Sequence, residues 1–157
     1  MQLKIQTDYA IRILMHLTKN KGYSSRKELC TCLGIAGTWL PVAPLLKTGW
    51  IASSYGPTGG YILVEDPKKI TLLDVMEVME DTIKMNRCLE TDGFCSRHAA
   101  KNCPVNQIYE AFQDIYEDYF MSVTIEDLLT PVFLRDLVLM EKSRMGISTD
   151  PSAISNP

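Results

Sequence analysis

The 157-residue sequence lacks several features that mark other protein classes. No apolar run approaches the roughly 18 residues that a membrane-spanning helix needs, so no membrane span or membrane partner is predicted. The N-terminus has no apolar signal core, so we expect a cytoplasmic protein. Thiols stay reduced in the cytosol, and the five cysteines are therefore expected to be ligands, sensors or core residues rather than disulfides.

Catalytic motifs are also missing. The sequence has no nucleophile elbow, no phosphate-cradling loop and no paired acids with a plausible pocket, so it is not predicted to be an enzyme. There is no low-complexity tract, and the composition, 46% hydrophobic and 22% charged, is that of a globular chain. The length suits one domain with an extension.

The charge is unevenly distributed along the chain. Residues 1–70 hold nine basic and four acidic residues, a formal charge of +5, whereas the remainder holds seven basic and fifteen acidic residues, a charge of −8. This division favours a nucleic-acid-binding face on a separate acidic support. Chance segregation over a solvated surface is the alternative.

The N-terminal half has the pattern of a winged helix-turn-helix. Apolar periodicity predicts helices near 8–20, 25–33 and 39–48, with Asp8 and Thr38 as caps of the first and third and with Ser25 and Glu28 as a capping box for the second. Two short strands around a glycine-rich turn predict a hairpin near 50–64. The predicted fold class is mainly α with a small β-hairpin wing.

The C-terminal half predicts a support for this domain. Thr71 and Asp74 cap a further helix, and Pro104 opens a long helix after a loop with three cysteines. Apolar residues recur along the long helix at spacings of three and four, so it packs either on its own domain or on a second copy. The second alternative predicts a homodimer through Val105, Ile108, Phe112, Ile115 and Tyr119.

These elements give four predicted regions. They are a DNA-binding domain (1–81), a cysteine-containing loop (82–103), a dimerisation helix (104–122) and a C-terminal helical segment with a tail (123–157), whose helix is expected near 132–145. His16 is interpreted as structural. Cys30 and Cys32, two apart on a helix, are interpreted as core or half-buried residues.

The cysteine loop has the chemistry of a soft-metal site. Cys88, Cys95 and Cys103 are separated by six and seven residues, and thiolates are ligands suited to iron–sulfur clusters or zinc. Three reduced thiols in a surface loop are the alternative. The candidates for a fourth ligand are His98, Asn106 and Asp8 of the partner subunit.

Four stretches resemble the Rrf2 family of bacterial regulators, which includes the iron–sulfur cluster regulator, the nitric-oxide-sensing repressor and the cysteine-metabolism repressor. The stretches are Thr7–Arg12 (TDYAIR), Gly56–Tyr61 (GPTGGY), Ile70–Val75 (ITLLDV) and the loop with Cys88, Cys95 and Cys103-Pro-Val. The resemblance implies a homodimer with paired long helices, recognition helices in adjacent major grooves of double-stranded DNA, and an iron–sulfur cluster as cofactor.

Three departures from the family bear on DNA reading. Pro41 and Pro44 stand where the family has an unbroken recognition helix, and Pro44 is expected to remove an internal hydrogen bond at a cost of about 3 kcal/mol. Tyr55 replaces the wing arginine. The third helix has few donors for base edges. The predicted DNA contacts are Ser25, Arg26, Lys27, Thr38, Trp39, Lys47, Tyr55, Thr58, Gly59 and Gly60.

The sequence therefore predicts a DNA-binding transcription regulator, a redox- or iron–sulfur-responsive repressor. One alternative is a regulator that senses thiol chemistry or a small ligand without a cluster. Another is a protein-interaction dimer that has lost specific DNA binding, which the two prolines and Tyr55 motivate.

Overall fold

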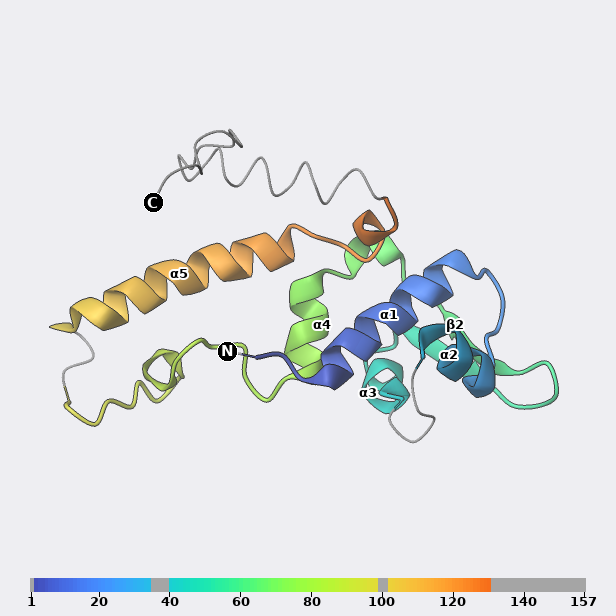
Figure 1. The fold of residues 1–157 in the computed structure, drawn as a ribbon, viewed down its shortest axis with the longest axis horizontal. Coiled ribbons are helices and arrows are strands. Elements are labelled where there is room, and N and C mark those ends of the chain that lie inside the picture. Colours follow the sequence, from blue (N-terminus) through green and yellow to red (C-terminus); the bar gives the residue numbers. More distant parts are fainter. Residues whose placement is uncertain (1, 35–39, 99–101, 131–157) are drawn as a thin grey trace, which may run out of the picture.

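The computed structural model describes residues 2–34, 40–98 and 102–130 (Figure 1). It is mainly helical, with one antiparallel hairpin. The helices are α1 (Ile5–Lys19), α2 (Arg26–Leu33), α3 (Val42–Lys47), α4 (Leu72–Met79) and α5 (Pro104–Met121), the strands are β1 (Ile51–Ser54) and β2 (Gly60–Leu63), and the 3₁₀ turns are η2 (Pro67–Lys69), η3 (Arg87–Leu89) and η5 (Asp127–Leu129).

The core gathers around α1. Its residues Ala10, Ile13, Leu14 and Leu17 are almost fully buried because spacings of three and four place them on one helix face. They pack with buried side chains from α2, α3, β1, α4 and the segment after α5: Leu29, Leu45, Ile51, Val75 and Ile125. The three short helices and the hairpin therefore share one apolar centre.

The predicted hairpin is present. β1 and β2 pair from Ile51 opposite Leu63 to Ser54 opposite Gly60. Ser24, before α2, adds a bridge to β2, since its N–H donates to the carbonyl of Tyr61 (2.9 Å) and its carbonyl accepts from the N–H of Tyr61 (2.8 Å). The wing is thus fixed to the start of α2 by backbone hydrogen bonds.

Two helix starts differ from the predictions. α1 begins at Ile5 after Lys4, so Asp8 lies inside the helix, where it pairs with Arg12 (2.8 Å) instead of capping. α3 begins only at Val42. Pro44 therefore lies in the first helical turn, whose N–H groups have no intrahelical acceptor, and the expected loss of a hydrogen bond does not arise. Thr38 and Trp39 lie outside the described residues.

The chain leaves the winged-helix domain after α4 and returns to it after α5. Thr71 and Asp74 form the predicted cap of α4, a complete capping box. At the return, the N–H of Leu72 donates to the carbonyl of Val123 (2.8 Å), and the N–H of Ile125 donates to that of Ile70 (2.9 Å). We call residues 80–122 the arm. The helix expected near 132–145 lies outside the described residues.

The arm projects from the domain, with the N-terminal end of α5 at its far tip (Figure 1). α5 starts at Pro104 as predicted, yet its only buried residues are two amides, Asn106 and Gln113. In the described part of the chain, no helix is both long and apolar enough to cross a membrane.

Candidate DNA-binding surface and cysteine loop

A groove of about 360 Å³ separates the start of α2 from the wing. Ser25 and Arg26 line one side, and Ser53–Gly56 and Gly59–Tyr61 of the wing line the other. Gly60 has a φ of +151°, and a Cβ there would collide with the carbonyl of Ser24. Glycine at this position therefore allows the wing to lie directly against the chain before α2.

The start of α2 carries polar and cationic groups. Ser25 caps the helix by accepting from the N–H of Glu28 (3.2 Å), while Arg26, Lys27 and Lys47 of α3 are all exposed. The capping box predicted here is only half formed, because the Glu28 carboxylate accepts hydrogen bonds from Ser24 and Asn20. The exposed N-terminal turn of α2 favours an anion such as a phosphate oxygen.

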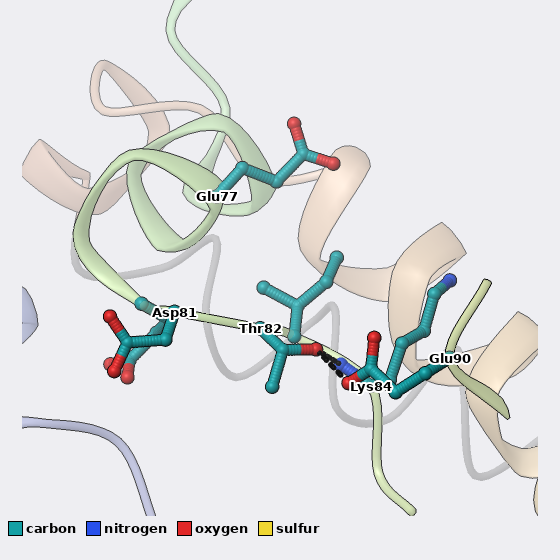
Figure 2. A pocket seen from close by; sticks show the side chains of 7 residues that line it. Glu77, Asp81, Thr82, Lys84 and Glu90 are labelled. Carbon is teal, nitrogen blue, oxygen red and sulfur yellow. Dashed lines mark hydrogen bonds between the residues drawn. The ribbon is translucent and has the colours of Figure 1, made fainter. Parts of the chain in front are cut away.

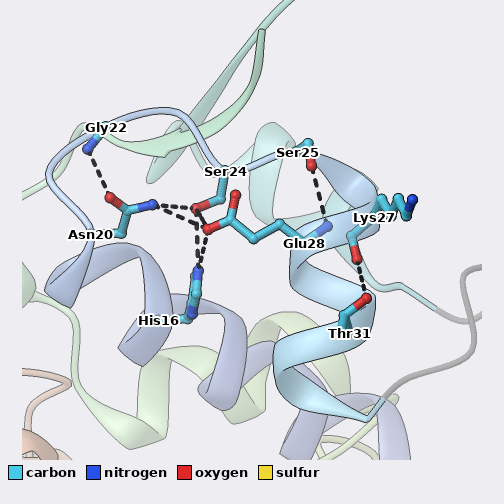
Figure 3. A network of polar contacts seen from close by, with 8 residues as sticks. All are labelled: His16, Asn20, Gly22, Ser24, Ser25, Lys27, Glu28 and Thr31. Carbon is cyan, nitrogen blue, oxygen red and sulfur yellow. Dashed lines mark hydrogen bonds and ion pairs between the residues drawn. The ribbon is translucent and has the colours of Figure 1, made fainter. Parts of the chain in front are cut away.

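A partly buried polar network around Ser24 fixes how α1, α2 and the wing meet (Figure 3). The hydroxyl of the fully buried Ser24 accepts from Asn20 (2.7 Å), donates to Glu28 (3.2 Å) and lies 3.2 Å from Nε2 of His16. His16 is thus structural, as predicted, with Glu28 at 3.4 Å. Sequence reasoning missed Ser24, because a serine beside a capping serine gives no periodic signal.

The wing tip is open. Tyr55 is 100% exposed, and Thr58 is exposed as well. The structure therefore brings Ser25, Arg26, Tyr55, Gly59 and Gly60 around one groove, with Lys27 and Lys47 exposed on the neighbouring helices. Their contacts with DNA remain predictions.

The candidate ligands of the cysteine loop do not lie together as a metal site. Cys88 lies in η3, Cys103 directly precedes α5, and Cys88, Cys95 and Cys103 are all half-buried. Among the described residues, no three His, Cys, Asp or Glu side chains lie close enough together to hold a metal ion. All five cysteines lie in the described ranges, and none forms a disulfide. Cys30 packs against the core, but Cys32 is exposed, contrary to its prediction.

Two further candidate ligands have separate positions. His98 is exposed, with a φ of +51°. The carboxylate of Asp8 is 2.8 Å from Arg12 on the same face of α1. The remaining candidate, Asn106, contacts one of the cysteines directly, because its Nδ2 donates to Sγ of Cys88 (3.3 Å).

Two residues of α5 hold the start of the cysteine loop. Gln113 accepts from the N–H of Met85 (2.8 Å) and donates to the carbonyl of Ile83 (3.1 Å), as a neighbouring β-strand would. Lys84 lies 2.6 Å from Glu117, and its hydrogen bond lowers the pKa of that carboxyl. Sequence reasoning missed Gln113; its spacing of seven from Asn106, which places both on one helix face, was the available signal.

The root of the arm is acidic. Glu77, Glu80, Asp81 and Glu90 surround a groove of about 210 Å³ with Lys84 (Figure 2). Thr82 donates to Glu90 (2.6 Å), and Lys4 pairs with Asp81 (2.9 Å). Burial of the Tyr116 hydroxyl, together with the charges of Glu80 and Glu117, raises the pKa of Tyr116.

The predicted dimer residues lie along α5, outside the acidic groove. Val105, Ile108, Phe112 and Ile115 are each about half exposed or more (49–66%), and Tyr119 is partly buried. We call these five residues the apolar stripe. An apolar surface of this kind on a helix is typical of a binding interface.

Residues 3–131 match the family described as "Rrf2: Iron-dependent Transcriptional regulator". The chain belongs to the Rrf2 family. It is therefore a member of a family of DNA-binding transcription regulators and not of enzymes.

Individual proteins are also similar to this chain. Protein aau3 of Rhizobium meliloti is 30% identical over 132 residues, which cover 82% of this chain and 85% of that protein. A protein of Aquifex aeolicus named as an HTH-type transcriptional regulator is 36% identical over 85 residues, or 54% of this chain and 59% of the relative. The solved structure of CymR (YrzC), named as the global cysteine regulator of B. subtilis, matches with a TM-score of 0.62 and 27% identity, covering 82% of this chain and 95% of CymR.

The loop fits the iron chemistry of the Rrf2 family by its donor set. Three thiols, none fully buried, lie in one loop that ends at the N-terminus of α5, where the helix dipole favours negative charge. In their described positions the three thiols do not form a group that could hold a metal ion. Binding of one cluster would therefore require the loop to bring its thiols closer together.

Proposed function

We propose that this protein is a homodimeric repressor that binds double-stranded DNA and responds to redox state or to an iron–sulfur cluster. Cys88, Cys95 and Cys103 would hold the cluster, with Asp8 of the partner subunit or His98 in the fourth position. A bound cluster would supply a centre sensitive to oxygen or nitric oxide.

The observation that carries this proposal is the hydrogen bond from Asn106 to Cys88. Asn106 is 6% exposed and belongs to α5, so the thiol is connected to the helix that presents the apolar stripe. A thiolate accepts this hydrogen bond more strongly than a thiol does. Ligation or oxidation of Cys88 would therefore change the strength of a contact between the cysteine loop and the dimerisation helix.

Gln113 supports the same route about two turns further along α5. Its amide holds the backbone of Ile83 and Met85, so a shift of the loop also pulls on the middle of the helix. A tilt of paired α5 helices would alter the spacing of the two DNA-binding surfaces, which must match half-sites about one DNA turn apart.

The sensing role is tested by anaerobic purification of the wild type and of Cys95→Ser. We expect iron, sulfide and visible absorbance in the wild type after reconstitution, and their loss in the variant. A wild type with neither iron nor sulfide rejects the cluster. The cluster-free thiol sensor then takes its place, a function favoured by the lack of a three-ligand metal group among the described residues and by the likeness to a cysteine regulator.

DNA binding is tested by its salt dependence. Neutralising Arg26, Lys27 and Lys47 together should flatten the slope of log affinity against log salt by about 0.9 for each lost phosphate contact. The control is the neutralised acidic triplet Glu110, Asp114 and Asp118 on α5, which should leave the slope unchanged. If the wild type binds no duplex at all, the protein-interaction dimer becomes the better description.

A further inference from the structure

A ring of contacts closes the chain between Cys88 and Cys95. The guanidinium of Arg87 forms two parallel hydrogen bonds with the carboxylate of Asp92. The same guanidinium lies over the ring of Phe94, 5.6 Å from its centre. The N–H of Phe94 donates back to Asp92 (3.3 Å). Arg87, at the start of residues 87–94, is thereby joined to Asp92 and Phe94 at their end.

The backbone inside this segment is also closed. The N–H of Glu90 donates to the carbonyl of Arg87 (3.3 Å), and the N–H of Gly93 donates to that of Glu90 (2.8 Å). Gly93 has a φ of +55°, a conformation that glycine adopts without strain. These consecutive turns make residues 87–94 a folded unit, which we call the Arg87 loop.

The two cysteines occupy matching positions at the ends of the Arg87 loop. Cys88 directly follows Arg87, and Cys95 directly follows Phe94. The guanidinium–ring contact therefore joins the two residues that precede the cysteines. An open six-residue spacer would leave the thiols at variable separation, whereas this closure restricts it before any ligand arrives.

We infer that Arg87, acting through Asp92 and Phe94, is a positioning residue that preorganises Cys88 and Cys95 as a thiol pair for one soft metal centre. The inference rests on the proposed sensing function. Arginine suits the task because its planar fork binds a carboxylate in two places and also stacks on an aromatic ring. Preorganisation improves affinity because less conformational entropy is lost on binding.

The first experiment measures affinity for Co²⁺, added alone to the reduced full chain, by the thiolate-to-cobalt absorption band. Arg87→Ala and Asp92→Asn should each lower affinity by about tenfold, the usual scale for residues that orient metal ligands. Arg87→Lys keeps the charge but not the fork, and should recover only part of the loss. Arg97→Ala removes an exposed arginine of the same cysteine loop and should match the wild type.

The second experiment needs no metal. In a chain whose remaining cysteines are Cys88 and Cys95, dibromobimane becomes fluorescent when it bridges the two thiols. Arg87→Ala should slow bridging relative to alkylation by a reagent that takes one thiol. Far-ultraviolet circular dichroism should be unchanged, which separates positioning from unfolding.

The outcomes distinguish the two proposals. If Arg87→Ala bridges its thiols and binds Co²⁺ as the wild type does, or if the wild type does not bridge at all, the positioning role is wrong. If bridging depends on Arg87 but the wild type binds neither Co²⁺ nor iron, the positioning role stands and the metal-sensing function fails.

Discussion

The winged-helix domain and the arm are held together by opposite kinds of contact. In the domain, apolar side chains from α1 to α4 are buried, and the polar cluster around Ser24 is partly buried. In the described part of the arm, most of the apolar stripe of α5 is exposed and the buried residues are the amides Asn106 and Gln113.

The difference follows from what each region can bury alone. Burial of a Leu or Ile side chain contributes about 1.5–3 kcal/mol to stability, and the domain buries many such side chains. The arm relies on a few hydrogen bonds, each worth about 1 kcal/mol. A region stabilised in this way is expected to open more easily, which suits a segment that responds to a ligand.

Breaking the apolar stripe should give the largest effect. We predict that Ile108→Glu with Ile115→Glu converts the proposed dimer to monomers, because each protomer would lose the burial of two large apolar side chains and would bury charges instead. Analytical ultracentrifugation measures this change. Asp114→Asn, between them on an exposed position, is the control and should stay dimeric; an unchanged mass for the double variant would place the interface elsewhere.

Removing the amide of Gln113 should have an intermediate effect. Gln113→Ala leaves the N–H of Met85 and the carbonyl of Ile83 without this partner, at a cost of about 1–3 kcal/mol. Hydrogen exchange at the Met85 amide should accelerate accordingly. Gln107→Ala, exposed on the same helix, should leave that exchange rate unaltered. Equal rates in the two variants would contradict the role given to Gln113.

The ion pair of Glu117 and Lys84 should give the smallest effect. Folding lowers the pKa of Glu117, so its ionised form stabilises the folded state above the unfolded pKa of about 4.3, and this contribution is lost as pH falls through the lower folded pKa. Because the pair is partly exposed, we expect about 1 kcal/mol or less at neutral pH.

Urea unfolding of wild type and Glu117→Gln across this acid range measures the contribution. The two free energies should differ at neutral pH and converge once Glu117 is protonated in the folded wild type. A constant difference at every pH would mean that the glutamine disturbs packing rather than charge. Asp118→Asn, with an exposed carboxylate, is the matched control.

Periodicity and turn chemistry predicted most of the domain, since spacings of three and four mark α1 and glycines mark the wing. The predicted start of α3 was wrong, because Thr38 offered a cap and Pro44 was placed in the helix interior; the helix starts later, with Pro41 before its first residue and Pro44 in its first turn. Asp8 was wrong as a cap for the same kind of reason: a good capping residue can also sit within a helix.

The arm was predictable only in outline. Its long helix and cysteines are visible in the sequence, but the hydrogen bonds of Gln113 with Ile83 and Met85 span about thirty positions and leave no periodic trace. Arg87 and Asp92 are five residues apart, a spacing that predicts contact in no regular element. Tertiary polar contacts of this kind depend on the path of the chain rather than on local pattern.

The chain leaves and re-enters the domain at one place, where Ile70 and Leu72 form hydrogen bonds with Ile125 and Val123, so the arm is attached to the domain at one end. Its 18-residue helix measures about 27 Å and ends beside strand-like hydrogen bonds that close the root. A rotation of about 5° at that root moves the far end by about 2 Å. In the other direction, a displacement of the cysteines at the far end would rotate α5 about its attachment to the domain, and the length of α5 would set how large that rotation is.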